Sequence, residues 1–325
     1  MNRRALMAWL AAVCTSVLSQ SNFLAIHGAR ASQQPSPKED ILNKIKQIKE
    51  AEARALADIP FRRVETTGQE ALAVWERLRK EEAGWPVIVG NDKDLLRIAQ
   101  QLQGLAEGPR KPEDILAAAS SLRFPEDLRR KIEEDDRASS EQLQKLMKGA
   151  GKWPEVTTID PGGQSQKLPG MEAQKFFEAG LAAAKREPAV GEWPDDPSWV
   201  SDLSVIGDYS QEYFPKVHIL VLPTSESAAV PAFLQWGGWN SCPLPEHHVA
   251  ALRSWHERYG AELIGLSGDV MNLRVKRRPS TRDEALAIAR EQFLYCQDIV
   301  WQGTGTLAPL ATTLLNGDWW YFWWD

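Results

Sequence analysis

The chain has 325 residues, 43% of them apolar and 25% charged, which is typical of a soluble globular protein with about two domains. Its formal net charge at pH 7 is −6. Because an acidic chain is repelled by phosphate groups, this charge argues against a general role in binding nucleic acids or anionic membranes.

The first 31 residues have the features of a secretory signal peptide. Arg3 and Arg4 make a basic start, Ala5 to Val13 is apolar, and Ala29-Arg30-Ala31 supplies small residues at the cleavage positions. The apolar run is too short for a confident membrane span. We therefore expect residues 1–31 to be removed and the protein to be exported to the periplasm or the exterior. The alternative is an uncleaved N-terminal segment that anchors the chain in the membrane.

Residues 32–152 are expected to form a helix-rich N-terminal region that contains a short α/β unit. Apolar residues recur there at helical spacing, and a short apolar run that begins at Trp85 is typical of a buried strand. Asn91 or Asp92 is suited to cap the helix that follows this strand. The expected elements are helices over Lys38–Ala57 and Gly68–Glu82, a strand over Trp85–Gly90, a helix after Asn91, and charged, mostly helical chain over 110–148.

Residues 153–199 have the composition of an irregular linker. Pro161-Gly162-Gly163, Pro169-Gly170 and Pro194-Asp195-Asp196-Pro197 interrupt regular structure there. One helix is expected within this stretch, near 171–185.

Residues 200–325 are expected to form a C-terminal domain with a mixed β-sheet flanked by helices. The fold class is then α/β, with α+β as the alternative. Of the 14 tryptophans in the chain, eight lie from Trp236 onward, and six consecutive aromatic residues between Asp318 and Asp325 predict a buried final strand. The other expected elements are a strand over Val217–Leu222, a helix over Pro245–Tyr259, a hairpin over Glu262–Lys276, a helix from a Thr281/Glu284 capping box to Cys296, and a helix over Thr306–Asn316.

The C-terminal domain also carries several uncommon sequence blocks in one order. They are Trp236-Gly237-Gly238-Trp239-Asn240-Ser241-Cys242-Pro243, His248, Leu252-Arg253-Ser254-Trp255, Tyr259-Gly260-Ala261-Glu262-Leu263, Tyr295-Cys296-Gln297-Asp298-Ile299-Val300, Gln302-Gly303 and Trp320-Tyr321-Phe322-Trp323-Trp324-Asp325. In this order they resemble the bacterial family called domain of unknown function 4253, from about Tyr213 to Asp325. Since that family has no established function, the resemblance implies no activity, cofactor or partner.

Cys242, His248 and Asp298 are the candidate catalytic residues. Cys242 lies just before a helix start, which can lower the pKa of a thiol, and His248 shares a face of the predicted helix with Leu252. A hydrolase-like enzyme would use Cys242 or Asp298 as its reactive group, with His248 beside it. The alternative is a buried histidine that forms a hydrogen bond with a neighbour.

The two cysteines that remain after cleavage, Cys242 and Cys296, could form a disulfide in an oxidising compartment. The position of Cys296 on the apolar face of its predicted helix favours free thiols instead. The chain has no H-x-x-x-H or C-x-x-C spacing, so we expect neither a metal site nor a cofactor.

Trp236-Gly237-Gly238-Trp239-Asn240 is the candidate binding motif. Two indoles separated by glycines can form a stacking platform for a sugar or a base, or an edge that binds a protein. The structural alternative is a bulged strand with its rings packed inward.

Gln302 and Gly303 form a second candidate site, because the free amides of a helix start can bind an anion. The basic cluster formed by Arg274, Lys276, Arg277, Arg278 and Arg282 is expected to be a solvated edge, with an acidic partner as the alternative.

These patterns favour a binding or protein-interaction module over an enzyme, since no catalytic constellation or cofactor fingerprint is recognisable and aromatic residues are abundant. Its partner would be a protein or a small ligand and not a nucleic acid. The hydrolase-like enzyme that uses Cys242 or Asp298 with His248 is the alternative function.

Overall fold

The computed structural model describes residues 37–103, 108–150, 156–159, 165–168, 175, 187–195, 203–206 and 212–324. The predicted signal peptide, all but one residue of the predicted helix near 171–185, and Asp325 lie outside the described residues. The chain divides into two compact units. The sheet unit comprises Ala31–Leu128 and Ala189–Asp325, and the other unit comprises Met1–Arg30 and Arg129–Pro188.

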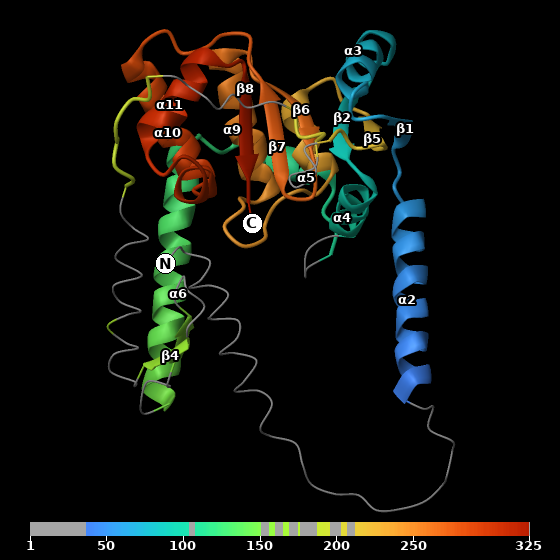
Figure 1. The fold of residues 1–325 in the computed structure, drawn as a ribbon, viewed down its shortest axis with the longest axis horizontal. Helices are drawn as coiled ribbons and strands as arrows, with labels where there is room; N and C mark the ends of the chain where they lie inside the picture. Colours follow the sequence, from blue (N-terminus) through green and yellow to red (C-terminus); the bar gives the residue numbers. More distant parts are fainter. Residues whose placement is uncertain are drawn as a thin grey trace, which may run out of the picture. The chain divides into compact units, whose positions relative to one another are not determined.

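The sheet unit is built on a mixed six-stranded sheet in the order β1-β5-β2-β6-β7-β8 (Figure 1). Strands β2 and β6 are parallel, and every other neighbouring pair is antiparallel. The sheet and its flanking helices confirm the predicted fold class and the helix-rich N-terminal part. The strands are β1 (Arg62–Thr66), β2 (Trp85–Gly90), β5 (Val217–Leu222), β6 (Glu262–Leu266), β7 (Val270–Arg274) and β8 (Trp319–Trp323).

Strands from both sides of the predicted linker belong to this one sheet. β2 has all six residues buried and lies between β5 and β6, so it joins the C-terminal strands to each other. β1 was not predicted from the sequence, because its five residues are short of apolar side chains and mostly exposed. It is a strand because it pairs with β5, a contact with a segment far away in the chain.

The N-terminal helices of the sheet unit are α2 (Pro37–Ala57), α3 (Ala71–Glu81) and α4 (Asp92–Leu102). Asn91 caps α4 as predicted: its side chain accepts hydrogen bonds from the amides of Lys93 and Asp94, and the Asp94 carboxylate accepts one from the Asn91 amide. α3 and α4 pack against β2 and β5.

The C-terminal helices are α9 (Pro245–Tyr259), α10 (Arg282–Tyr295) and α11 (Leu307–Asn316), close to their predicted limits. Only half of the predicted capping box of α10 is present. Thr281 accepts from the Glu284 amide, but the Glu284 carboxylate accepts from Ser280 rather than from the Thr281 amide. The connecting turns are η1 (Ser227–Ala229), α8 (Val230–Phe233) and the π-helical turn η2 (Ile299–Thr304).

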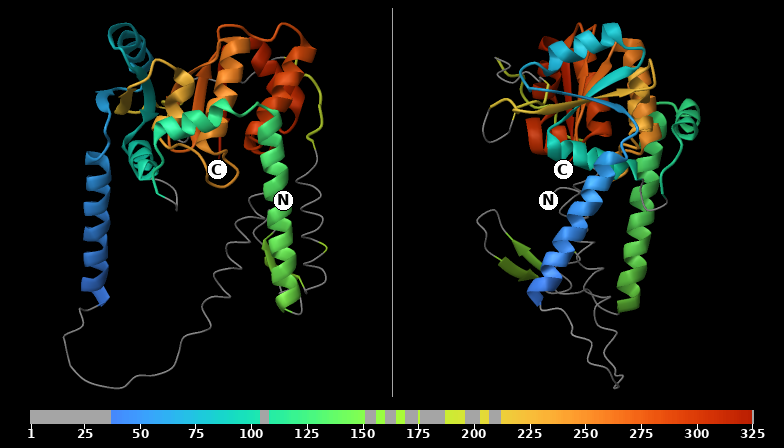
Figure 2. Two further views of the ribbon diagram at one scale, coloured as in Figure 1. Left: turned by 180° about the vertical axis from the view of Figure 1, so that it is seen from behind. Right: turned by 90° about the vertical axis from the view of Figure 1, so that its right-hand side faces the viewer.

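Helix α5 (Pro112–Ser120) packs against α9. Figure 2 shows the ribbon from behind and from one side. Helix α6 (Glu126–Ala150) starts at the end of the sheet unit's first segment. Strands β3 (Val156–Ile159) and β4 (Ser165–Leu168) form an antiparallel hairpin within the predicted linker. These four-residue strands are largely polar, so no apolar pattern predicted them.

The aromatic residues of the last strand, with Trp324 directly after it, pack into the core. Trp320, Phe322 and Trp324 alternate along the chain and are all buried. The Trp255 ring of α9 stacks on Phe322 with its centroid 5.4 Å away. β8 is thus a buried strand at one end of the sheet order, and the prediction of a buried aromatic strand is confirmed.

Within the described part of the chain, no helix combines the length and the apolar character that a membrane crossing requires.

Candidate functional site

The candidate binding motif lies in a loop, 235–243, that connects α8 to α9 and is called here the tryptophan loop. Four of its residues have positive φ: Gln235 (54°), Gly237 (118°), Gly238 (86°) and Asn240 (48°). The loop is therefore not the bulged strand of the structural alternative, although one of its rings does pack inward. Positive φ at non-glycine residues costs free energy, and such residues concentrate at functional sites.

Gly237 shows why the loop requires glycine. A Cβ at this position would lie 2.2 Å from the Pro243 carbonyl oxygen and 2.7 Å from His248 Nε2. The loop also closes on itself, because the Gly238 amide donates to the Pro243 carbonyl at 2.8 Å. The backbone is thus packed directly on the His248 ring, and no larger residue fits there.

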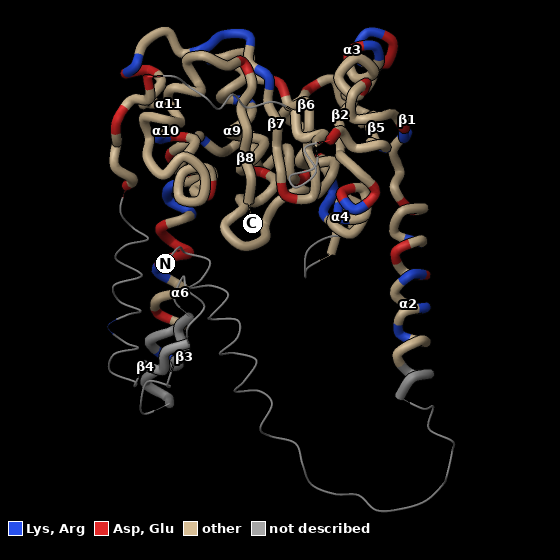
Figure 3. Tube along the Cα trace, viewed as in Figure 1, with Lys and Arg blue, Asp and Glu red and all other residues tan. Residues whose placement is uncertain are grey.

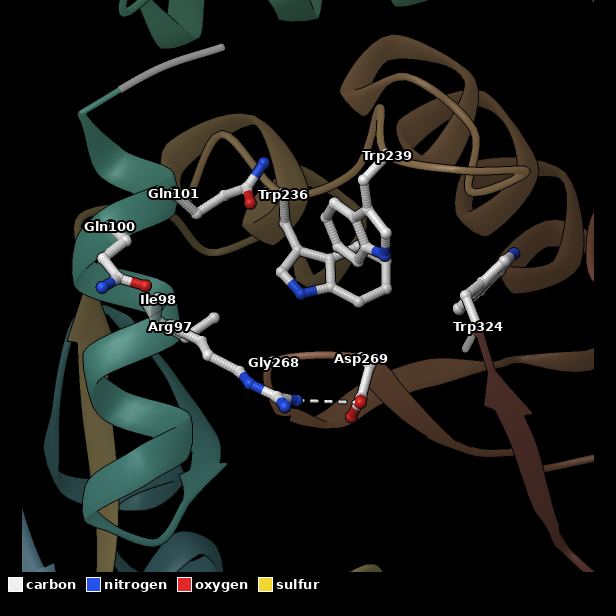
Figure 4. Close-up of a pocket in the computed structure, with 9 residues that line it drawn as sticks. All are labelled: Arg97, Ile98, Gln100, Gln101, Trp236, Trp239, Gly268, Asp269 and Trp324. Carbon is white, nitrogen blue, oxygen red and sulfur yellow. Dashed lines mark hydrogen bonds and ion pairs between the residues drawn. The ribbon is translucent and has the colours of Figure 1, made fainter. Parts of the chain in front are cut away.

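Beside the tryptophan loop is a pocket of about 410 Å³, which is within the usual range for small-molecule sites, roughly 300–1,000 Å³ (Figure 4). We call it the tryptophan pocket. It lies among helix α4, the tryptophan loop, the β6–β7 turn and the residue that follows β8. It is lined by Arg97, Ile98, Gln100, Gln101, Trp236, Trp239, Gly268, Asp269 and Trp324.

The tryptophan pocket lies at the carboxyl ends of the two parallel strands. β2 ends at Gly90 and leads into α4, and β6 ends at Leu266 and leads into the turn that contains Gly268. Because parallel strands end at the same edge of a sheet, their following segments meet there and leave a crevice between them. This is the usual location of ligand sites in open α/β sheets.

Three indoles form the apolar side of the tryptophan pocket. Trp236 contacts Trp239 at 4.8 Å and Trp324 at 5.4 Å, both edge to face. Trp236 is 0% exposed and Trp324 is 1% exposed, so they form a rigid back wall, whereas Trp239 is only partly buried. The Trp236 Nε1 donates to the Ser267 carbonyl at 2.8 Å, which fixes its ring against the β6–β7 turn.

The polar side of the pocket is an ion pair. Arg97 Nη1 of α4 lies 2.8 Å from Asp269 Oδ2 of the β6–β7 turn, opposite the Trp236 and Trp239 rings in Figure 4. Gln101, from the next turn of α4, donates to the carbonyls of Gln235 and Gly237 at 2.9 and 3.0 Å. α4 therefore both lines the pocket and holds the tryptophan loop in place.

The predicted catalytic residues Cys242 and His248 do meet, but in the core. Cys242 Sγ lies 3.4 Å from His248 Nε2, and His248 Nδ1 lies 2.5 Å from the Tyr295 hydroxyl. Both residues are buried, and neither lines the tryptophan pocket. Asp298 accepts a hydrogen bond from Gln302, whereas His248 Nδ1 contacts the Tyr295 hydroxyl.

Burial sets the protonation of this pair. It raises the pKa of the Cys242 thiol well above its usual range and lowers the pKa of His248 well below its usual range. At neutral pH the pair is therefore a thiol beside a neutral imidazole. A catalytic cysteine requires the opposite, a thiolate stabilised by its surroundings. Cys296 is likewise a free, buried thiol, in agreement with the free-thiol interpretation.

The candidate anion site at Gln302 and Gly303 lies in η2. The amide of Gly305 donates to the Val300 carbonyl at 2.7 Å. The first amides of α11, those of Leu307 and Ala308, donate to the carbonyls of Ala189 and Val190 at 3.0 and 2.6 Å. An anion at this helix start would have to displace those carbonyls.

Figure 3 marks in blue the basic residues of the segment between β7 and α10. The side chains of this cluster contact other parts of the same chain. Lys276 pairs with Glu262 at 2.7 Å, Arg277 donates to backbone carbonyls of α9, and Arg278 donates to the Asn316 carbonyl. Arg274 lies near Glu76 and Asp318, and Arg282 lies over the Trp193 ring. These contacts use part of the hydrogen-bonding capacity that an acidic partner would need.

Among the residues that the structure describes, no three His, Cys, Asp or Glu side chains gather in a way that could hold a metal ion.

Sequence reasoning found Trp236 and Trp239 but missed the polar side of the pocket. Arg97 and Asp269 are 172 residues apart and meet only because β2 and β6 are neighbours. For Gln101 and Trp324 the sequence likewise predicts only a position in a helix and in the final strand. No local signal in the sequence pairs such distant residues.

Comparison with known protein families agrees with the resemblance drawn from the sequence blocks. Residues 218–325 match the family described as Domain of unknown function (DUF4253), which covers the C-terminal third of the chain. No curated protein and no solved structure matches the chain.

Proposed function

We propose that this chain, whose residues 218–325 form a DUF4253 domain, acts as a binding module with the tryptophan pocket as its binding site. The observation that carries the proposal is the pocket itself, a concave site of about 410 Å³ with indole walls and an ion pair opposite them. This lining combines aromatic walls with charged and amide groups, and ligand sites commonly pair apolar walls with a few oriented polar groups.

The strained backbone beside the pocket supports the same proposal. Gln235 and Asn240 have φ of 54° and 48°, conformations that cost free energy in residues other than glycine. The surrounding hydrogen bonds from Gln101 keep the tryptophan loop in this form. A site that is fixed before the ligand arrives loses less conformational entropy when it binds.

A fragment library screened by ligand-observed NMR tests the proposal. We expect the NMR effects that report fragment binding to the native protein to disappear with the Trp239→Ala variant, because Trp239 is the partly exposed wall of the pocket. Trp301→Ala is the matched control, since Trp301 is an indole 38% exposed that packs on Phe293 away from the pocket lining. A screen without hits, or with hits indifferent to Trp239, would contradict the proposal.

The hydrolase-like alternative rests on the 3.4 Å contact between Cys242 and His248. The burial of both groups and the directions of their pKa shifts oppose it. Hydrolysis of an activated ester that disappears in Cys242→Ser, with an unchanged unfolding midpoint, would favour the enzyme over the binding module.

We also propose export of the protein, on the basis of the basic start, the apolar run and the cleavage positions in residues 1–31. Fractionation of the producing cells and N-terminal sequencing test this proposal. The expected result is a mature chain that begins at Ser32; an intact N-terminus in the cytoplasm would contradict it.

A further inference from the structure

We infer that the tryptophan pocket binds an uncharged sugar ring, and this inference rests on the proposed binding function. It adds the chemical class of the ligand, which neither the family match nor the sequence blocks supply. Three properties of the lining carry it: its charge balance, its arrangement of donors and acceptors, and the partly exposed Trp239 indole.

The charge of the lining is balanced. The residues that line the tryptophan pocket include one cation, Arg97, and one anion, Asp269, which form an ion pair at 2.8 Å. A phosphate or carboxylate bound to Arg97 would be repelled by the adjacent Asp269 carboxylate, and an ammonium group bound to Asp269 would be repelled by Arg97. The pocket therefore favours a ligand without net charge.

The ion pair leaves donors and acceptors side by side. The Arg97 guanidinium has five N–H donors, and it contacts Asp269 through Nη1. The Asp269 carboxylate accepts through Oδ2 in this contact and has a second oxygen. Neighbouring sugar hydroxyls can each donate and accept, so they match adjacent Arg and Asp groups. Gln100, which also lines the pocket, adds an amide with both functions.

The opposite wall suits the apolar face of a sugar ring. Trp239 is the partly buried indole of the pocket, and its ring is held at 83° to the Trp236 ring, with centroids 4.8 Å apart. The face of an indole is electron-rich, and it attracts the weakly positive C–H groups that cover one side of a pyranose. The hydroxyls at the rim of the same sugar would then point to Arg97 and Asp269 across the pocket.

Isothermal titration calorimetry of the full chain tests the inference with defined probes. The neutral set comprises tetrasaccharides of glucose, galactose and N-acetylglucosamine, and the charged set comprises tetragalacturonate, AMP and choline. We expect at least one neutral tetrasaccharide to bind and every charged probe to bind roughly tenfold or more weakly. Titration of the corresponding polymers distinguishes a free sugar from a polysaccharide as the source, and binding of either form supports the inference.

Two variants test the two walls separately. Trp239→Ala should weaken sugar binding by roughly tenfold or more, and Trp239→Phe should restore part of it because an aromatic face remains. In Gly268→Ala the new Cβ would lie 2.2 Å from Arg97 Cδ, so Arg97 must move while the indoles stay. We expect this variant to fold and to lose sugar affinity to a similar extent. Trp301→Ala and Gly305→Ala, both away from the pocket lining, are the controls and should bind like the native chain.

The outcomes separate this inference from the proposed function. A charged probe that binds more tightly than every sugar, in a manner that depends on Trp239, overturns the sugar assignment and leaves the binding function intact. Absence of binding in both sets also overturns the sugar assignment. The binding function itself fails only if the fragment screen has no hits that depend on Trp239.

Discussion

At the scale of single residues, the tryptophan loop depends on Gly237. Its φ of 118° is outside the range of other residues, and its Cα faces the Pro243 carbonyl and the His248 ring. His248 in turn contacts Cys242 and Tyr295, so the loop lies on a buried polar group with fixed partners. The candidate catalytic residues Cys242 and His248 thus lie beneath the loop that carries Trp236 and Trp239 and support it.

Gly237→Ala is expected to lower the free energy of unfolding by about 3 kcal/mol or more, because it combines backbone strain with a steric clash. Gly305→Ala is the control: Gly305 also has positive φ, 74°, but no atom lies within 4 Å of the position of a Cβ. That variant should lose only about 1 kcal/mol from strain. Urea unfolding measures both, and equal losses would contradict this account of Gly237.

His248 makes stability dependent on pH. Its pKa is lowered well below 6.5 in the folded chain, so below pH 6.5 the unfolded chain binds a proton that the native protein does not. The free energy of unfolding should therefore fall by up to about 1.4 kcal/mol per pH unit as the pH decreases from this value. Urea unfolding between pH 7 and pH 5 should show a smaller decrease in His248→Gln, which lacks the titrating ring. Equal slopes in both proteins would contradict the assignment.

The buried thiols of Cys242 and Cys296 should be unreactive, because burial raises the pKa of each and the thiolate is the reactive form. At pH 8 we expect iodoacetamide to modify the native protein on the order of 100-fold more slowly than the urea-unfolded chain. Mass spectrometry of the alkylated peptides measures this ratio. Faster reaction of Cys242 in the native state would instead favour the hydrolase-like alternative.

At the scale of secondary structure, helix α4 connects the sheet to the pocket. Its N-terminus is fixed by the Asn91 capping box at the end of β2, and its next turns present Arg97 and Gln101 to the pocket and to the tryptophan loop. The last strand also connects the sheet to the pocket. Trp320 and Phe322 of β8 are buried, and Trp324, which follows β8, lines the pocket.

Asn91→Ala removes the side chain that accepts from two amides at the start of α4, and it should cost about 1 kcal/mol of stability. Lys111→Ala is a matched control, because Lys111 is the N-cap of α5 and makes no capping hydrogen bond with its side chain. Thermal unfolding of both variants measures the difference. An equal decrease in the two midpoints would show that the cap does not stabilise α4.

At the scale of the whole molecule, the sheet unit is assembled from two segments of chain. β2 lies between β5 and β6. Without the N-terminal segment, no strand connects β5 to the β6-β7-β8 part of the sheet. The sheet therefore extends beyond the residues that match DUF4253, 218–325, because β1 and β2 lie in the N-terminal segment.

A fragment of residues 200–325 should consequently lack a cooperative thermal transition, because β5 and β6 have lost the strand that they share. A chain from which Arg129–Pro188 is removed and the ends joined by a flexible linker keeps every strand of the sheet and should unfold cooperatively. Near-UV circular dichroism during heating measures both. A cooperative transition in the short fragment would show that the C-terminal strands form a core by themselves.

The sequence by itself determined the fold class, the limits of most helices and strands, and the two indoles of the tryptophan loop. These features depend on local patterns, such as the uninterrupted apolar run of β2, the Asn91 cap and the six consecutive aromatics near the C-terminus. Only the tertiary structure decided that polar β1 joins the sheet, that Cys242 and His248 are buried, and that Arg97 and Asp269 meet across from Trp239. The physical reason is that these features arise from tertiary contacts, which join segments more than a hundred residues apart in the case of β1 with β5 and of Arg97 with Asp269. Neither helical period nor strand alternation carries information about such contacts.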